Sequence, residues 1–465
     1  MGQPSFLADS RARRPLTVGL VMMITVAAFE ALGTATVMPA VKDDLGGVAL
    51  YGFAFSAYML ASLVGIAFAG EQADRHGPGR PYAVGLLLFA TGLVIAGLAP
   101  AMWVLVIGRT VQGLGAGVIP PVAYVTVGRA YPEEERPRLL ALFATAWVVP
   151  GLVGPGLAGA AAEYLTWRLV FIGILPLVGA ATLLTLPNLR RIGPPAEAAA
   201  DVPSRIPKAI QLAAGAGLVL GGPAVGIPWL AVVLIVPGIV IAIPALRALL
   251  PEGTFRARPG LPSLVLGVGA LNMAFFGVDA FVPLMLTEVR GQSTVIAGLV
   301  VTAATLSWSA GSWLVERRAK HDDPRFLARI GFSLLLAGTI GLLPALFDAV
   351  PVAWVLVAWG VAGLGIGMAY PCFSLILLSV AAETEVGAVT ASTKLSESLS
   401  AAIGTGAAGV LVALGDAGGW LPGSLALAFA LMAAVALTGG SLTQRLPGRV
   451  PEGAEERQPV AAAAK

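Results

Sequence analysis

The feature that most constrains this chain is its alternation of long uncharged apolar runs with short charged segments. The runs 51–69 and 82–101, for example, contain no Asp, Glu, Lys or Arg. A helix of about twenty apolar residues crosses the hydrocarbon core of a bilayer and satisfies its own backbone hydrogen bonds there. Only 12% of the residues are charged and 57% are hydrophobic, whereas a soluble domain is about 25% charged. The sequence therefore predicts an all-α integral membrane protein.

Fourteen apolar runs are long enough to be predicted as membrane helices. They are 17–38, 51–69, 82–101, 102–128, 138–162, 168–187, 208–221, 227–248, 262–287, 294–315, 327–347, 352–380, 386–414 and 422–442. The region 208–248 is the least regular, because Gly221, Gly222 and Pro223 interrupt it. This region is expected either to cross the membrane twice or to form a hairpin that returns to one face.

The distribution of basic residues predicts the orientation of the helices. With the N-terminus in the cytoplasm, nearly all Lys and Arg residues lie inside, as the positive-inside rule requires. The exceptions are Lys42, Arg168 and Arg290 outside, and Arg109 and Lys394 within helices. We therefore predict a multi-pass protein of the cell membrane, plasma or inner, with both termini cytoplasmic.

A charged segment at 70–80 separates two of the uncharged runs. Its glycines and Pro78 predict a tight reversal at the cytoplasmic face. The residues Gly70, Asp74, Arg75, Gly77 and Arg80 resemble the pattern of the short cytoplasmic loop between helices 2 and 3 in the major facilitator superfamily of transporters. The resemblance implies that this loop acts as a gate that latches two halves of the protein together on the cytoplasmic side.

An internal repeat supports the division into halves. The glycine run Gly113–Gly117 recurs 250 residues later as Gly363–Gly367, and Glu30 has a near counterpart in Asp279. In the resembled family, two six-helix bundles are related by a pseudo-two-fold axis, here with two extra helices between them. The expected organisation is a cytoplasmic N-terminus (1–16), an N-terminal bundle (17–187), a linker with two membrane helices (188–260), a C-terminal bundle (261–442) and a disordered cytoplasmic tail (443–465).

A charged guanidinium inside an apolar helix requires a partner or water. Arg109 and Gln112 belong to a sequence that resembles the Arg-x-x-Gln-Gly-x-Gly motif of proton-coupled superfamily members. At 1.5 Å per residue, Glu30 lies about 20 Å from the cytoplasmic start of its helix and Arg109 about 10 Å from the outer start of its own. In a core about 30 Å thick the two lie at similar depth. Either the Glu30 carboxylate carries a proton that is exchanged across the membrane, or the two side chains form a permanent ion pair that braces two helices.

Two further stretches resemble the 14-helix drug:proton antiporters. The run Phe29–Pro39 resembles helix 1 of that family, which usually carries Asp where this chain has Glu30. Gly154, Pro155 and Gly159 match the Gly-Pro-x-x-Gly-Gly motif that marks antiporters, with Ala158 replacing one glycine. The alternative for this helix is ordinary close packing of small residues.

The second half of the chain carries other ionisable residues within apolar runs. Lys394 and Glu397 are three residues apart and share a helix face, so they are expected to pair. Asp279 and Asn272 also share a face. Proton coupling is therefore assigned to Glu30, Arg109, Asp279, Lys394 and Glu397, and the substrate cavity to Phe29, Tyr58, Gln112, Trp147, Asn272 and Phe276, with Phe275, Trp308 and Tyr370 as additional aromatic candidates.

Several activities are disfavoured by the sequence. It contains no Gly-x-x-x-x-Gly-Lys-Ser/Thr loop, no nucleophile elbow and only two histidines and one cysteine, so no enzyme activity, metal, cofactor, disulfide or nucleic-acid partner is expected. The resemblance implies a monomeric efflux transporter surrounded by membrane lipids. It would exchange protons for a hydrophobic or amphipathic, possibly cationic, small molecule by alternating access. Export of a lipid or metabolite on the same fold is the alternative, and a non-transporting receptor or scaffold is a third reading.

Overall fold

The computed structural model of the chain describes residues 10–193, 204–319, 321–380 and 386–447. Within these residues all of the regular structure is helical. Fourteen helical segments are long and apolar enough to cross a membrane. The prediction of an all-α protein with fourteen membrane helices is therefore confirmed.

The helices follow one another along the chain with short connections. The N-terminal half contains α1 (Ser10–Leu45), α2 (Tyr51–His76), α3 (Gly79–Gly97), α4 (Met102–Ala116), α5 (Ile119–Ala130), α6 (Arg136–Thr145), α7 (Val148–Tyr164), α8 (Leu169–Ile172) and α9 (Leu175–Leu189). Two linker helices follow, α10 (Ile206–Gly221) and α11 (Pro228–Leu249). The C-terminal half contains α12 (Leu261–Asp279), α13 (Val282–Leu284), α14 (Thr294–Arg318), α15 (Pro324–Gly341), α16 (Ala353–Val380), α17 (Val386–Ala417) and α18 (Leu421–Leu442).

Some predicted helices are divided in the structure. The span 102–128 breaks between α4 and α5 at Gly117 and Val118, and α5 then begins with Ile119 and two prolines that lack a backbone N–H. The span that begins with α12 ends in a π-helical turn, Met285–Val289. Each break lies within one candidate span, so the number of crossings is unchanged.

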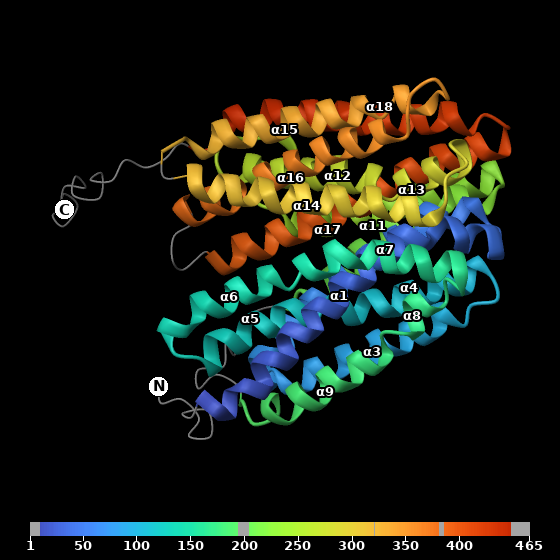
Figure 1. The fold of residues 1–465 in the computed structure, drawn as a ribbon. Coiled ribbons are helices and arrows are strands. Elements are labelled where there is room, and N and C mark those ends of the chain that lie inside the picture. The colour runs from blue at the N-terminus through green and yellow to red at the C-terminus, as the bar shows by residue number, and fades with distance from the viewer. Residues whose placement is uncertain (1–9, 194–203, 320, 381–385, 448–465) are drawn as a thin grey trace.

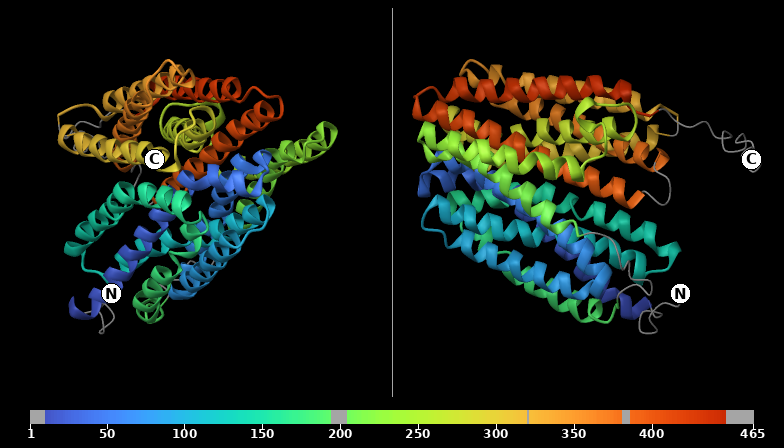
Figure 2. Two further views of the ribbon diagram at one scale, coloured as in Figure 1. Left: turned by 45° about the vertical axis from the view of Figure 1, so that its right-hand side comes forward. Right: turned by 180° about the vertical axis from the view of Figure 1, so that it is seen from behind.

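The two halves form two bundles that lie one above the other in Figure 1, with the start of α1 and the end of α18 on the same side of the molecule. We call that side the terminal face and the opposite side the far face. In the C-terminal bundle α12 lies centrally, surrounded by the other helices (Figure 2). Accordingly, its span is the most buried of the fourteen.

The repeat seen in the sequence is matched by the packing. A Cβ on Gly113 of α4 would lie 2.2 Å from the Tyr58 carbonyl oxygen of α2, and a Cβ on Gly363 of α16 would lie 2.2 Å from the Ala304 carbonyl oxygen of α14. Only glycine permits backbones to approach so closely. The same glycines therefore make equivalent helix crossings in the two halves.

The linker helices run across the junction of the two bundles (Figure 2). Both are candidate membrane spans, and they pack on each other with Gly215 against Gly238. Of the two possibilities for 208–248, the structure favours two crossings. A hydrophobic cluster joins α10 to α2 of one bundle and α17 of the other through Leu60, Leu63, Leu212, Ala216, Leu220, Leu399 and Ala402.

Two predicted helix boundaries are wrong. Helix α1 begins at Ser10 rather than 17, and Arg13 near its start forms an ion pair with Glu135 at 2.6 Å. Helix α2 continues through the charged segment to His76, so the reversal is confined to Gly77 and Pro78. The reason is that Glu71 and Arg75 pair one turn apart at 3.1 Å, which stabilises the last turns.

The predicted tail also begins later than expected. A short 3₁₀ helix, Thr443–Arg445, follows α18, and Thr443 and Leu446 are buried. The Arg445 carbonyl accepts a hydrogen bond from Ser263 Oγ at the start of α12. Residues 448–465, the rest of the expected disordered tail, and most of the N-terminus expected at 1–16 lie outside the described residues.

Candidate functional site

The centre of the N-terminal bundle holds a buried ion pair. Arg109 on α4 donates from Nη1 to Glu30 Oε1 on α1, and both side chains are almost fully buried. Thr34 Oγ1, one turn along α1, donates to the same carboxylate oxygen at 2.7 Å. Arg109 Nη1 also donates to Gln112 Oε1 at 2.7 Å. The two side chains therefore meet, as the depth argument expected.

Close helix packing positions this pair. Gly108 and Gly113 flank Arg109 on α4, and a Cβ on Gly108 would lie 2.6 Å from the backbone nitrogen of Ala96 on α3. The guanidinium carbon of Arg109 lies 4.1 Å from the centre of the Tyr58 ring on α2, which is within cation–π range. Small residues on α4 thus bring the charged side chain into contact with two neighbouring helices.

The polar groups of this cluster are only partly satisfied. Glu30 Oε2, Arg109 Nε and Gln112 Nε2 are buried and have no hydrogen-bond partner among the described residues. Buried polar atoms are usually paired, and an unpaired one costs about 1–3 kcal/mol. The cluster consequently has one free acceptor, which can take a proton, and two free donors, which can bind a polar group.

The C-terminal bundle holds a second buried carboxylate, Asp279 at the end of α12. Its Oδ1 accepts a hydrogen bond from Trp359 Nε1 on α16 at 3.2 Å. Trp359 is fully buried and stacks on Phe275, with ring centres 4.9 Å apart. No described basic side chain pairs with Asp279 within 4.0 Å. This carboxylate therefore lies in an aromatic rather than an ionic environment.

The sequence analysis did not single out Trp359. Its position is 250 residues after Arg109, the same offset that relates Gly113 to Gly363. Extending the repeat by four residues would have identified it as the partner of the second carboxylate. The two halves thus place different donors, a guanidinium and an indole, at equivalent positions.

An aromatic row continues from Trp359 across the C-terminal bundle. Phe275 contacts Phe276 and Trp308, and Trp308 contacts Tyr370, with ring centres 5.3–6.2 Å apart. Tyr370 in turn meets the predicted pair on α17: Lys394 Nζ donates to the Tyr370 hydroxyl at 2.6 Å and to Glu397 Oε2 at 2.9 Å. The expected pairing of Lys394 with Glu397 is therefore present.

Other predicted cavity residues lie apart from these clusters. Phe29 faces Gly154 of α7, where a Cβ would lie 3.4 Å from its ring. Trp147 immediately precedes α7 and is 47% exposed. Asn272 is buried and donates to the Val268 carbonyl of its own helix at 2.9 Å, and among the described residues no hydrogen bond joins it to Asp279. The structure therefore brings Tyr58 and Gln112 to Arg109 but does not gather all six candidates at one point.

Helix α7 joins the two bundles on one side of the junction. A Cβ on Gly159 would lie 2.7 Å from the Thr294 carbonyl oxygen of α14, and a Cβ on Gly298 would lie 2.4 Å from the Pro155 carbonyl oxygen. Near the end of α7, Glu163 Oε2 accepts a hydrogen bond from the Thr294 backbone N–H at 3.1 Å. The small residues of the predicted antiporter motif therefore lie at or beside the contact between bundles.

Helix α2 makes the corresponding contact on the other side. Ser56 Oγ donates to the Ala402 carbonyl at 2.8 Å, and the Tyr51 hydroxyl donates to the Ala280 carbonyl at 3.0 Å. An ion pair, Lys42 Nζ with Glu288 Oε2 at 2.6 Å, adds a third link. These groups lie toward the far face, and among the described residues no hydrogen bond or ion pair joins the two bundles near the terminal face. Among the described residues, the polar links between the bundles thus lie toward the far face alone.

In this state the charged segment at 70–80 contacts its own bundle and the linker, where Ser204 Oγ donates a hydrogen bond to Glu71 Oε2. Asp74 pairs with Arg129 of α5 at 3.0 Å, and no ion pair joins it to Arg75 or Arg80 among the described residues. Gly77 has φ 80°, and a Cβ there would lie 2.5 Å from the Ile192 carbonyl oxygen, so the reversal requires glycine. Gly70 and Arg80 lie in α2 and α3, respectively.

The described residues contain no group of three or more His, Cys, Asp or Glu side chains that could hold a metal ion.

Two six-helix bundles with buried charged residues and extra helices between them define a membrane transporter. The chain belongs to the major facilitator superfamily, whose family model matches residues 18–405.

Similar proteins carry related descriptions. The chain is 26% identical over 398 residues to a probable multidrug-efflux transporter of Mycobacterium tuberculosis, covering 82% of this chain and 83% of that protein. It is 26% identical to the multidrug transporter protein MdtP of Bacillus subtilis (84% and 74% covered) and 24% identical to the multidrug efflux pump SdrM of Staphylococcus aureus (85% and 89% covered).

Solved structures confirm the fold. A bacterial homolog of the human lysosomal transporter Spinster, in an inward-facing and unoccupied conformation, superposes with a TM-score of 0.68 at 14% identity, covering 94% of this chain and 98% of that chain. The xylose transporter XylE of E. coli, in a partially occluded inward-open conformation, gives a TM-score of 0.64 at 14% identity, covering 96% and 99%. These likenesses show the fold alone.

Proposed function

We propose that this transporter exports hydrophobic or amphipathic compounds, including cations, in exchange for protons. The observation that carries the proposal is the buried, incompletely satisfied pair of Glu30 and Arg109 at the centre of the N-terminal bundle. Ionisable residues inside membrane helices are costly and usually functional. The names of the multidrug-efflux relatives support the substrate class.

The proposed coupling begins with a proton on Glu30. Protonation neutralises the carboxylate and weakens its attraction for Arg109, whose other contacts are Gln112 and the Tyr58 ring. The guanidinium then exchanges partners, which changes how α1 and α4 pack. A proton binds one conformation better than the other and so shifts the population between them. A cationic substrate that competes for the same carboxylate would leave as the proton enters.

The second half supplies further proposed coupling groups. Among the described residues Asp279 accepts a hydrogen bond from an indole alone, so protonation removes a poorly compensated charge. Lys394 Nζ donates a hydrogen bond to Glu397, and the Tyr370 hydroxyl donates a second one to the same carboxylate. The aromatic row from Phe276 to Tyr370 would offer contact area to an apolar substrate. With Phe29, Tyr58, Gln112, Trp147 and Asn272, these side chains form the proposed substrate path.

We propose that the terminal face is cytoplasmic, in a cell membrane. The bundles, proposed as 17–187 and 261–442, are joined at the far face, so the state described here would be inward-open. Closing the terminal face would then bring Asp74, Arg75 and Arg80 toward the other bundle, where they would act as the cytoplasmic latch. We further propose that the transporter works as a monomer, since each chain contains both halves.

The proposal is tested by transport in proteoliposomes with an imposed pH gradient. The probe is ethidium, a lipophilic cation, and the variants are wild type and Glu30→Gln. We expect gradient-driven uptake by wild type and its loss in Glu30→Gln. A matched control is Glu135→Gln, which removes a carboxylate paired with Arg13 at the terminal face and should keep uptake.

Three other outcomes would contradict the proposal in part or in whole. Uptake that survives in Glu30→Gln would assign the Glu30–Arg109 pair a purely structural role. Absence of ethidium uptake by wild type, together with gradient-driven movement of a labelled phospholipid or an organic acid, would instead establish lipid or metabolite export. A wild-type protein that moves none of these probes would overturn the transport proposal for this substrate class.

A further inference from the structure

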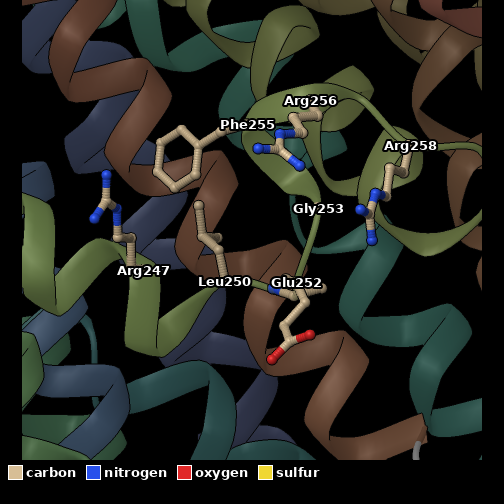
Figure 3. A pocket seen from close by; sticks show the side chains of 8 residues that line it. Arg247, Leu250, Glu252, Gly253, Phe255, Arg256 and Arg258 are labelled. Atoms are coloured by element: carbon tan, nitrogen blue, oxygen red, sulfur yellow. The ribbon is translucent and has the colours of Figure 1, made fainter.

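A cavity of about 340 Å³ lies where α11 ends and the chain turns toward α12. Three arginines line it: Arg247 from the last turn of α11, and Arg256 and Arg258 from the loop that follows. Leu250 lies between Arg247 and the two loop arginines (Figure 3). We propose that this cavity binds the phosphate group of an anionic phospholipid. The inference is independent of the proposed transport function.

The loop that carries Arg256 and Arg258 has a defined shape. Gly253 has φ 86° and Ala257 has φ 48°, and Ala257 is the one non-glycine residue with positive φ in the described chain. Arg445 Nη1 donates to the Ala257 carbonyl at 3.1 Å, which holds this strained residue in place. Buried Thr254 donates to the Pro251 carbonyl at 2.6 Å. The two arginines are therefore presented by a fixed turn.

The charges around the cavity are not balanced by the protein. No hydrogen bond or ion pair to the side chains of Arg247, Arg256 or Arg258 is found among the described residues, and Glu252 is the one carboxylate in the lining. The lining thus has a net charge of about +2. Guanidinium groups bind phosphate oxygens through two parallel hydrogen bonds, so these arginines give the cavity the charge and the donors that a phosphate requires.

An exposed apolar surface leads from the cavity along α11. Val236, Val240 and Ile243 are 54%, 65% and 39% exposed, and with Arg247 they share one helix face because they are spaced four, three and four residues apart. Only 11% of the membrane-length window of α11 is buried. Phe255, 61% exposed, borders the cavity. Acyl chains would lie along this face with the headgroup at the arginines.

The position of the cavity selects a lipid over a soluble phosphate. The loop contacts Arg445, so it lies at the terminal face where α11 leaves its membrane-length run. A basic pocket at that level, between helices, meets the headgroups of one leaflet. Its apolar side opens onto α11, where a free phosphate would gain nothing.

The test is lipid binding by the purified full-length protein, measured by native mass spectrometry in detergent. The probes are phosphatidylglycerol and phosphatidylcholine. The variants are Arg256→Ala/Arg258→Ala and, separately, Arg247→Ala. All three arginine side chains are exposed, so the variants should fold as wild type does, and size-exclusion profiles check this. The control is Arg317→Ala/Arg318→Ala, which removes the same two charges from the end of α14.

We expect wild type to bind phosphatidylglycerol in preference to phosphatidylcholine. At about 1 kcal/mol per arginine, the double variant should bind phosphatidylglycerol about thirtyfold more weakly and Arg247→Ala about fivefold more weakly. The control should match wild type. This pattern would support the site.

Three results would overturn the proposal. Equal weakening by the Arg317→Ala/Arg318→Ala control would mean that overall charge holds the lipid. Equal binding of the two lipids would mean that the headgroup charge is not recognised. Displacement of phosphatidylglycerol by millimolar inorganic phosphate, with no headgroup preference, would assign the cavity to a soluble anion.

Discussion

At the scale of single residues, the two halves of the chain stabilise a buried carboxylate in different ways. Each bundle buries one carboxylate near its centre, Glu30 or Asp279. The first is met by Arg109 and Thr34, and the second by Trp359. A guanidinium neutralises the charge, whereas an indole only donates a hydrogen bond. The pseudo-symmetric scaffold therefore carries two chemically distinct sites.

The first prediction concerns the ion pair. Arg109→Met should lower the free energy of unfolding by about 3–5 kcal/mol, because Glu30 is left as an uncompensated buried charge. The double variant Glu30→Gln/Arg109→Met should lose less than Arg109→Met alone. The midpoint of thermal unfolding in detergent measures both. If the double variant is no more stable than Arg109→Met, the buried charge is not the cause of the loss.

The second prediction concerns Trp359. Trp359→Phe keeps a ring against Phe275 but removes the donor to Asp279, so it should cost about 1–3 kcal/mol of unfolding free energy. The double variant Trp359→Phe/Asp279→Ala should lose less unfolding free energy than the two single variants lose in sum, because each single change already removes the same hydrogen bond. Thermal unfolding of the four proteins completes this cycle, and strict additivity would show that the hydrogen bond contributes nothing.

At the scale of helices, glycine determines which pairs cross closely. Gly113 and Gly117 allow α4 to touch α2, and Gly363 and Gly367 allow α16 to touch α14. These crossings hold Arg109 and Trp359 toward the carboxylates on α1 and α12. Close packing of this kind leaves no room for an added methyl group.

The third prediction follows from these crossings. Gly113→Ala should destabilise the protein by about 1–3 kcal/mol, because its Cβ would overlap the Tyr58 carbonyl. Gly128→Ala in α5 is the matched control, since nothing lies within 4 Å of a Cβ there. The control should be neutral or slightly stabilising, as alanine favours helix more than glycine. Equal unfolding midpoints for the two variants would contradict the packing argument.

At the scale of the whole molecule, the bundles are joined at one face. The contacts there comprise backbone-close helix crossings, a few hydrogen bonds and the Lys42–Glu288 ion pair. Because the described polar links lie toward one end, the bundles are expected to rock about the junction. The cluster of α10 with α2 and α17 lies along this junction and would stay packed as the ends open and close.

The fourth prediction concerns the ion pair at the far face. Lys42→Ala should shift the population toward opening of that face by about fivefold, corresponding to about 1 kcal/mol for a partly exposed pair. Spin labels are attached at Leu165→Cys and Asp348→Cys, both exposed, and double electron–electron resonance measures the distance between them. The natural Cys372 is buried and should not be labelled. A larger fraction of long distances is expected.

The control for this measurement is Arg168→Ala. Arg168 pairs with Asp44 at 2.7 Å near the same face, but both residues belong to the N-terminal bundle. Removing an ion pair within one bundle should leave the distance distribution unchanged. A shift of the same size in Arg168→Ala would indicate a general loss of packing rather than release of the junction.

The sequence by itself determined the number of membrane helices, the two-fold repeat and the depth at which Glu30 meets Arg109. These follow from local physics: apolar length sets the crossings, and the helical rise converts residue number to depth. It also placed Lys394 beside Glu397, since residues three apart share a helix face. Its errors lay at helix ends, where α2 ran through its charged segment to His76.

Only the tertiary structure decided which distant side chains share a partner. Asp74 binds Arg129 rather than its sequence neighbours, and Asp279 receives Trp359. The arginines around the α11 cavity are gathered by a turn that Arg445 holds from the other end of the chain's C-terminal half. Such pairings depend on how helices cross, and periodicity within one helix carries no information about the rotation and translation of the next.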